Sequence, residues 1–367
     1  MSQSAPHLLP DYGRRRGNII LLRVLDGMTY TTAIGGALVM LGLLLLLIGT
    51  VFHGALPAIR QFGWEFFTTS TWDPAIEHKF GVLPAIYGTL MTSVLAMVIA
   101  VPVSIGSAVF LVKIAPKVRI PIPRFGTPSR WMWVAPRPLV TVASFLIELL
   151  AAIPSIAYGL WGVFVLVPFM QKVQPFLSGT AKLTRMPGIG PYLPEWKVGL
   201  NLSHLPGVGY LFVNSGSGYN CFTCGIILAI MVTPIITAIV RDVLAVAPPE
   251  LEQGALGLGA TWWQATRMVL GFSKMGIVGA VILGFARAIG ETMAVTMVIG
   301  NSPQIGSVFS YGETIASKLA SQFREADPVY ERSALIYAAL VLLIITTLIN
   351  GAARLMVMQV ARKAGKK

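Results

Sequence analysis

The sequence predicts an all-α polytopic membrane protein with six transmembrane helices. Hydrophobic residues make up 55% of the 367 residues and charged residues only 12%, whereas charged residues account for about a quarter of an average soluble domain. Six apolar segments reach the roughly 20 residues that a helix needs to cross a bilayer. The apolar content excludes a disordered chain, and the presence of only 2 cysteines excludes a disulfide-stabilised scaffold.

The predicted spans cover residues 30–52, 82–112, 139–170, 222–240, 276–300 and 334–353. The second and third are longer than one upright helix needs, so they must tilt, kink or project from the bilayer. Pro102 and Pro154 are the expected kink points, because proline removes a helical hydrogen bond. No small-residue cleavage site follows the first span, which predicts a retained anchor rather than a removed signal peptide.

Lysine and arginine are distributed unequally between the two sides of the membrane. One side, which includes both chain ends, carries 18 of the 28, and the other side carries 9. The positive-inside rule therefore places both termini in the cytoplasm. The net charge of +13 is interpreted as a topology signal with lipid-headgroup contacts. A nucleic-acid partner is not expected, because no basic patch is combined with a recognition motif.

The predicted organisation is a cytoplasmic N-terminal arm, residues 1–29, followed by the transmembrane domain, residues 30–367. Residues 171–220 are rich in Gly, Pro and Ser and predict an irregular external lobe. Residues 114–138 contain six prolines and no acid, which predicts an extended basic cytoplasmic loop. An outer loop contains four aromatic residues, interpreted as an interfacial belt in preference to a docking surface for an external partner: Trp64, Phe66, Phe67 and Trp72.

The fourth connection, residues 241–275, predicts two short helices that meet at a glycine. Pro248 and Pro249 suit a helix start, and acidic residues in the first turn complement the helix dipole. Gly257 and Gly259 then interrupt the helix. We expect Thr261 to cap a second amphipathic helix, with four residues on one side: Trp262, Ala265, Met268 and Val269. Periodicity alone favours an ordinary interfacial helix pair over a docking element.

Three ionisable residues fall inside predicted spans: Glu148 in the third, and Arg287 and Glu291 in the fifth. A charge at mid-bilayer costs at least about 2.5 kcal/mol, so such residues indicate function by default. Arg287 and Glu291 are four residues apart and share a helix face. They could instead neutralise each other, or Arg287 could bridge to Glu148. The functional interpretation is a polar patch that lines a substrate path.

Other features favour structural roles. Gly276, Ala280, Gly284 and Ala288 recur every fourth residue, which predicts close helix packing. Cys221 and Cys224 are interpreted as small buried residues in preference to a disulfide or redox pair. The 4 histidines show no metal-ligand spacing, and neither a P-loop nor a catalytic constellation occurs, so we expect no cofactor, no metal and no catalysis.

The connection of residues 241–275 resembles the EAA loop of ABC importer permeases, which docks on the ATPase subunit. The match includes Gly259, Ala260 and Thr261. It departs from the motif where Gln253 replaces glutamate, where Gly254 replaces alanine, and where glycine follows the last leucine in place of proline. The loss of a charge at residue 253 puts a salt bridge to the ATPase in doubt, but not the shape of the helix pair.

Three further segments resemble permeases of phosphate-specific ABC importers. They read FGVLPAIYGTLMTS at residues 80–93, ELLAAIPSIAYGLWG at 148–162 and GFARAIGETMAV at 284–295. The similarity runs from about residue 64 to the C-terminus, apart from residues 117–138 and 176–218, which are longer than usual. The last two motifs are specific to the phosphate permeases, whereas the EAA loop alone indicates the superfamily.

The resemblance implies a type I ABC importer permease (MetI-like) fold and a transport subunit, not an enzyme. It implies a sister permease that completes the pore, a dimer of ATP-binding subunits, and a periplasmic or lipid-anchored phosphate-binding protein at the inner membrane. It also implies an ATPase-coupling set: Glu252, Gln253, Gly254, Ala255, Gly259, Ala260 and Thr261. A gradient-driven carrier and an importer of sulfate or molybdate are the alternatives.

Overall fold

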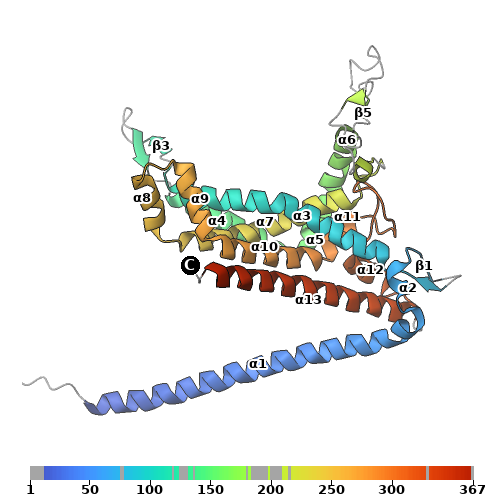
Figure 1. Cartoon of the computed structure of the whole chain (residues 1–367), viewed down its shortest axis with the longest axis horizontal. Helices are drawn as coiled ribbons and strands as arrows, with labels where there is room; N and C mark the ends of the chain where they lie inside the picture. The colour runs from blue at the N-terminus through green and yellow to red at the C-terminus, as the bar shows by residue number, and fades with distance from the viewer. Residues whose placement is uncertain are drawn as a thin grey trace, which may run out of the picture. The chain divides into compact units, whose positions relative to one another are not determined.

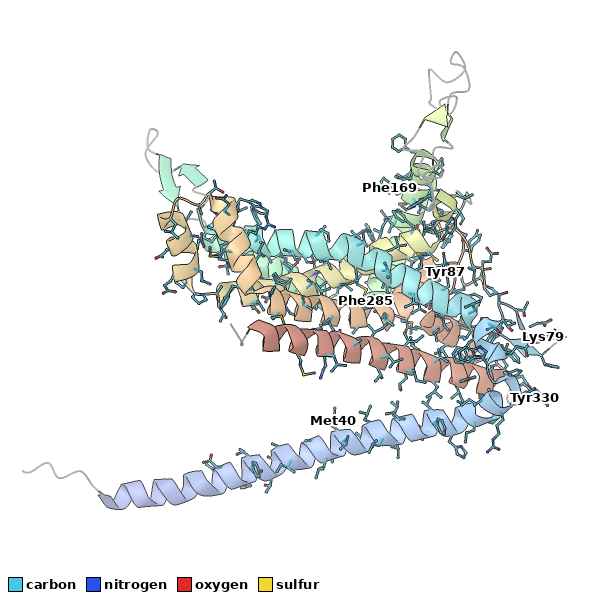
Figure 2. All side chains as sticks on the ribbon, viewed as in Figure 1. Met40, Lys79, Tyr87, Phe169, Phe285 and Tyr330 are labelled. Carbon is cyan, nitrogen blue, oxygen red and sulfur yellow. The ribbon has the colours of Figure 1, made fainter. Side chains whose placement is uncertain are left out.

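The computed structural model describes residues 12–74, 78–117, 120–123, 131–134, 137–178, 181–182, 197–198, 209–213, 216–327 and 330–364. The chain forms two compact units, Met1–Gly54 and Ala55–Lys367. The first unit holds most of helix α1 (Tyr12–Phe62). The apolar stretch of this helix buries none of its side chains, and Met40, labelled in Figure 2, is 70% exposed.

The second unit is built from helices with short strands between them (Figure 1). The helices are α2 (Glu65–Thr68), α3 (Leu83–Val109), α4 (Arg137–Ala152), α5 (Ser155–Trp161), α6 (Val167–Leu177), α7 (Cys221–Ala245), α8 (Pro249–Gly257), α9 (Trp262–Phe272), α10 (Lys274–Ile289), α11 (Met293–Val298), α12 (Ile315–Gln322) and α13 (Glu331–Ala364). Two π-helical turns, Phe110–Ile114 and Gly162–Leu166, follow α3 and α5.

In the part of the chain that the structure describes, the strands form three antiparallel pairs. They are β1 (Trp72–Asp73) with β2 (Lys79–Phe80), β3 (Ile120–Pro123) with β4 (Trp131–Val134), and β5 (Ala181–Lys182) with β6 (Lys197–Val198). The predicted basic loop, residues 114–138, therefore contains a hairpin in its described part. Most of the predicted external lobe, residues 171–220, lies outside the described residues.

The fold is all-helical apart from the short strand pairs, which agrees with the predicted class. The described residues contain five helices long and apolar enough to cross a membrane, or six if the bent pair α9–α10 counts as one span. The first, second, fourth and sixth predicted spans correspond to Leu25–Phe62, Leu83–Ile114, Cys221–Ala245 and Glu331–Leu355. Pro102, a predicted kink point, lies within α3, which continues past it.

The third predicted span, residues 139–170, is divided into separate helices at Pro154, which confirms this proline as a break point. The chain breaks before Pro154, whose ψ of 140° is extended. Because proline disfavours helical geometry in the preceding residue and lacks an N–H group, α4 ends at Ala152 and a new helix starts at Ser155. The apolar span in this region is Ser155–Leu177, and the apolar part of α4 is too short to be a candidate span.

The fifth predicted span, residues 276–300, is also interrupted. Helix α10 ends at Ile289 and α11 begins at Met293, and α9 and α10 are bent by 68° relative to each other. Glycine at position 290 serves as the C-cap of α10. The polar residue Glu291 therefore lies in a break between two helices, not inside one continuous helix.

The core lies where α3 and α10 pack on α7 (Figure 1). Helix α7 is the most buried span, with 67% of its apolar window inside the protein. A Cβ atom added at Gly276 would lie 2.5 Å from Val243, and one added at Gly284 would lie 2.6 Å from Ile236. The predicted small-residue stripe is thus confirmed as a close helix contact.

The two cysteines at the start of α7 are free and buried, which confirms their interpretation as small core residues. The aromatic belt was wrong for Phe66, which is 0% exposed. Its ring stacks on Tyr337 of α13 at a centroid distance of 4.4 Å. Trp72 packs against Phe80, whereas Trp64 is 78% exposed.

Candidate functional site

The connection between α7 and α10 forms the predicted pair of short helices. Proline at position 249 begins α8, and Gly259 adopts a φ of +84° after α8 ends. Thr261 then caps α9 through a reciprocal capping box: its backbone N–H donates to the Gln264 side chain at 2.8 Å, and its hydroxyl accepts from the Gln264 N–H at 3.4 Å. The predicted helix starts, the glycine corner and the threonine cap are all confirmed.

The buried face of α9 differs by one residue from the predicted face. Ala265 and Val269 are 0% and 1% exposed, as expected, but Met268 is 48% exposed and Thr266 is buried in its place. Thr266 can be buried because its hydroxyl donates to the Trp262 carbonyl one turn earlier at 2.9 Å. The amphipathic pattern predicted the helix correctly but placed this one side chain on the wrong face.

The outer surface of this helix pair is apolar. Leu258 is 91% exposed, Trp263 is 59% exposed and Leu256 is 42% exposed. A cluster of exposed apolar side chains on a compact protrusion is typical of a protein-interaction site. Among the residues of the predicted coupling set, Gln253, Gly254, Gly259 and Thr261 are exposed, Ala255 is buried, and Glu252 and Ala260 are partly buried.

Arg287 and Glu291 lie together at the break between α10 and α11. Nη2 of Arg287 is 3.8 Å from Oε2 of Glu291. The Arg287 side chain is 52% exposed and the Glu291 side chain is 6% exposed. Because Arg287 lies in the last turn of α10, its charge is also favourable for the helix dipole. The predicted pair is present, and its guanidinium is the more accessible partner.

Glu148 is not close to this pair. It lies on α4, and its side chain is 57% exposed. Arg241 Nη1 of α7 donates to Glu148 Oε1 at 3.0 Å. Glu148 therefore lies on the shorter apolar helix α4, which the break at Pro154 separates from the candidate span Ser155–Leu177. The alternative bridge from Arg287 to Glu148 is likewise replaced by the bond to Arg241.

A known protein-family model matches the part of the chain that contains the helix pair α8–α9 and the Arg287–Glu291 pair. The model of the binding-protein-dependent transport system inner membrane component matches residues 132–362. The phosphate transport system permease protein PstC of Haemophilus influenzae is 40% identical over 339 residues, covering 92% of this chain and 94% of that protein. PstC of Mesorhizobium japonicum is 38% identical and covers 93% of this chain and 92% of that protein.

The chain belongs to the PstC family of inner-membrane transport permeases. A probable PstC of Methanocaldococcus jannaschii is also similar, at 34% identity over 90% of this chain and 92% of that protein. A chain of the MetNI methionine ABC transporter, solved in inward-facing conformations, aligns with a TM-score of 0.47 at 17% identity, over 79% of this chain and 99% of that chain. The family assignment rests on the sequence matches alone.

As a PstC-family chain, the protein is a multi-pass component of the inner membrane and a transport subunit, not an enzyme. A binding-protein-dependent system includes a binding protein and ATPase partners, and ATP is hydrolysed by separate subunits. Gly159 of α5 lies close to α11, the helix that follows the Arg287–Glu291 pair. A Cβ atom added there would lie 2.6 Å from Met297 Sδ, so this glycine permits α5 to pack closely against α11, just after the Arg287–Glu291 pair.

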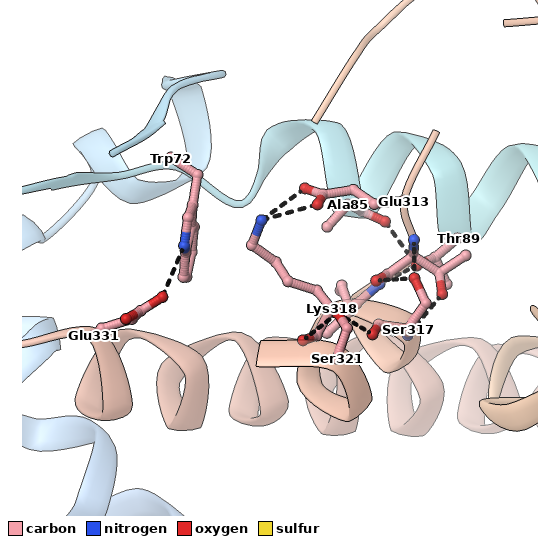
Figure 3. Close-up of polar contacts among 10 residues, drawn as sticks. Trp72, Ala85, Thr89, Glu313, Ser317, Lys318, Ser321 and Glu331 are labelled. Atoms are coloured by element: carbon pink, nitrogen blue, oxygen red, sulfur yellow. Dashed lines mark hydrogen bonds and ion pairs between the residues drawn. The ribbon is translucent and has the colours of Figure 1, made fainter. Parts of the chain in front are cut away.

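The sequence did not predict a second polar cluster, in the segment that follows α11 (Figure 3). Lys318 Nζ donates to both carboxylate oxygens of Glu313 at 2.9 and 3.0 Å, and both side chains are at most 2% exposed. The same ammonium group lies 4.0 Å from the centre of the Trp72 ring. The spacing of five residues gave no helical pairing signal, because neighbours on a helix are three or four residues apart.

Helix α12 is fixed to α3 beside this cluster. The Ile315 N–H donates to the Thr89 hydroxyl at 3.0 Å, and a Cβ atom added at Gly88 would lie 2.0 Å from the Glu313 carbonyl oxygen. These contacts give Gly88 and Thr89 a structural role: the glycine permits the backbone approach, and the threonine receives the N–H group near the start of α12.

Burial raises the pKa of Glu313 and lowers the pKa of Lys318, in each case against the opposing attraction of the partner. The effect of desolvation on both pKa values therefore exceeds the effect of the ion pair.

Removal of one partner by Lys318→Met should destabilise the protein by about 3–5 kcal/mol, because the other charge is left buried and unpaired. Replacement of both, by Lys318→Met with Glu313→Leu, should restore most of the loss. Thermal unfolding of the purified protein in detergent measures both effects.

Lys274→Met is the matched control, because Lys274 is exposed, and it should change the unfolding temperature little. Equal losses in the single and double variants would contradict the dominance of desolvation.

Proposed function

We propose that the chain is the permease subunit of an ATP-driven importer of inorganic phosphate, and that it forms half of the pore together with a sister permease. The similarity that carries this proposal is the 38–40% identity to phosphate permeases over more than nine-tenths of both chains. The exposed helix pair α8–α9 supports it, because an importer subunit without its own ATPase needs a docking surface for one.

In the proposed orientation both termini and the helix pair α8–α9 face the cytoplasm. The excess of lysine and arginine on this side supports the assignment. Strand β1 and helix α12 then lie at the opposite, external end of the second unit (Figure 1). A phosphate-binding protein, periplasmic or anchored to lipid, would deliver its cargo at that end. The basic chain ends would contact anionic lipid headgroups.

The ATPase dimer docks on the exposed residues of α8 and α9 in this proposal. Closure of the ATPase subunits on ATP moves the helix pair, and the pore changes from inward-facing to outward-facing. Hydrolysis resets it. The coupling residues are the set predicted from the motif: Glu252, Gln253, Gly254, Ala255, Gly259, Ala260 and Thr261. Gly259 is the corner between the two helices, and its φ of +84° favours glycine.

Arg287 and Glu291 line the substrate path in this proposal. A guanidinium group offers several N–H donors to an oxyanion. The Arg287 side chain is 52% exposed, and its contact with Glu291 is long at 3.8 Å. Its N–H donors are therefore accessible to an anion. A carboxylate repels an anion unless that anion carries a proton that it can donate. Phosphate carries such a proton near neutral pH and sulfate does not, so the pair favours phosphate.

The function is tested by uptake of labelled phosphate into vesicles that contain the complete transport complex. We expect uptake to require both this chain and ATP, and to be unaffected by excess sulfate. Uptake that persists without ATP would instead identify a gradient-driven carrier. If sulfate blocks the ATP-driven uptake, the protein is still an importer subunit, but its substrate is not specifically phosphate.

Glu291→Gln should reduce the discrimination between phosphate and sulfate, because the neutral amide no longer repels an anion that lacks a proton and its NH2 group can donate to sulfate. The measurement is competition by sulfate in the same uptake assay. Glu148→Gln is the matched control, since Glu148 bonds Arg241 and not the pair. If Glu291→Gln leaves the discrimination unchanged, the Glu291 carboxylate does not contact the substrate. If Glu148→Gln has an equal effect, Glu148 also lines the substrate path.

Gly259→Val should uncouple ATP hydrolysis from uptake while the protein still inserts. No atom lies within 4 Å of an added Cβ, so the cost is backbone strain of about 1–2 kcal/mol and not a steric clash. Gly259→Asn should be tolerated better, because asparagine adopts positive φ more readily. The ratio of phosphate transported to ATP hydrolysed measures the coupling. Equal ratios in the two variants would contradict a role for the positive φ.

A further inference from the structure

An ion pair connects helix α8 with the end of α3. Lys113 Nζ donates to Glu252 Oε2 at 2.5 Å, and the two side chains are 13% and 16% exposed. The residues are 139 positions apart in the sequence. Such a contact differs from a solvated surface pair, because partly desolvated charges attract each other more strongly and are screened less by salt.

The backbone around Lys113 has an unusual geometry. Helix α3 ends at Val109, and residues Phe110–Ile114 form a π-helical turn. A π turn holds one more residue than an α turn, so it rotates the following side chains by roughly 100° relative to a continuous α-helix. The direction of Lys113 towards α8 is therefore a property of this turn and could not be derived from α-helical periodicity.

Helix α8 has few other buried contacts. Ala255 is its one fully buried residue, and the neighbour against which it packs most is α9. Helix α9 leads directly into α10 through the bend at Ser273. The helix pair α8–α9 is joined covalently to α7 through residues 246–248 and to α10 through the bend at Ser273, and Val269 of α9 packs into the core. The Lys113–Glu252 ion pair adds a contact with the end of α3.

Helices α3 and α10 both pack on α7. A Cβ atom added at Gly225 of α7 would lie 2.9 Å from Leu95 Cβ of α3, and Ser104 of α3 donates to the Thr233 carbonyl of α7 at 3.1 Å. Close-packed helices transmit displacement because their interface cannot be compressed. A force applied to Lys113 therefore reaches the centre of the bundle through α3.

We propose that Lys113 and Glu252 form a strut that transmits movement of the helix pair α8–α9 to α3. Both are positioning residues: Glu252 faces the bundle and not the ATPase. The inference deepens the proposed function and rests on it. The strut requires that α3 and α10 move together with the helix pair. Helix α3 is joined to the pair by the ion pair, and α10 is joined to it by the chain.

Neighbouring polar residues of α8 provide the contrast. Glu250 and Gln253 lie in the same helix and are exposed, so their side chains are available to a docked partner. Glu252 is mostly enclosed and its carboxylate binds Lys113. A role in direct ATPase contact and a role as a strut therefore predict opposite behaviour when the charges of positions 113 and 252 are exchanged.

The experiment uses the complete transport complex in proteoliposomes with purified phosphate-binding protein, and measures phosphate taken up per ATP hydrolysed. Lys113→Glu and Glu252→Lys should each lower this ratio about fivefold or more, within the range of measured couplings between sites. The exchange of both, Lys113→Glu with Glu252→Lys, should restore most of it. Glu250→Lys is the matched control: combined with Lys113→Glu, it should give no rescue.

Charge reversal can disturb folding, so Lys113→Met and Glu252→Gln are compared as well. Each should lower the ratio while the ATPase subunits still copurify with the permease. The strut is overturned if the single variants leave the ratio unchanged. It is also overturned if exchange gives no rescue, or if Glu252→Gln releases the ATPase, which would show that Glu252 contacts that subunit.

Failure of the proposed function has a different signature. In that case the wild-type complex takes up no phosphate. The strut is then tested by measuring how much the binding protein stimulates ATP hydrolysis. The single variants should lose this stimulation, and the exchanged pair should regain it. The absence of that pattern overturns the strut independently of the substrate.

Discussion

The structure depends on the close approach of two helix backbones to α7. In a bilayer, apolar side chains gain little by leaving lipid, so helices associate through tight contact between small residues. Gly225 of α7 meets α3, and Gly276 and Gly284 of α10 meet α7. The coupling helices, the break that carries Glu291 and the attachment of α12 are all positioned relative to this three-helix core.

Helix breaks divide the third and fifth predicted spans, and one of these breaks carries Glu291. Helix α4 ends before Pro154, α9 and α10 meet at a bend of 68°, and α10 ends at Ile289 before Glu291. Backbone groups released at such breaks cannot be left in lipid and must be covered by protein or water. Close contacts at Gly159 and Gly162, which bring α5 and the following π turn against α11 and α7, provide such cover beside the Arg287–Glu291 pair.

Ion pairs in the described part of the chain fall into two kinds. Lys113–Glu252, Arg241–Glu148, Arg241–Asp242 and Lys318–Glu313 are short, and the first two join separate helices. Arg287–Glu291 is long and local, and its arginine is half exposed. Short pairs satisfy the charge of a buried or partly buried group, which is costly to leave unpaired. The long pair leaves donors free for another anion, which is why the substrate path is proposed there.

Sequence reasoning predicted the helical class and most of the coupling helices because these depend on local chemistry. Pro249, Gly259 and Thr261 act on their own turn of backbone, so each could be assigned without tertiary information. The stripe from Gly276 to Ala288 likewise predicted a contact face, although not its partner. The one wrong side chain in α9, Met268, shows the limit of periodicity, which gives a direction but not what lies opposite.

By itself the sequence determined an all-helical membrane protein, a pair of short helices with a glycine corner, and an arginine one turn from a glutamate. The tertiary structure alone decided that Glu148 binds Arg241, that Lys113 reaches Glu252, and that Lys318 is buried against Glu313 and Trp72. These contacts depend on where helices break and which faces meet, and a π turn or a proline changes both by rotating every side chain that follows.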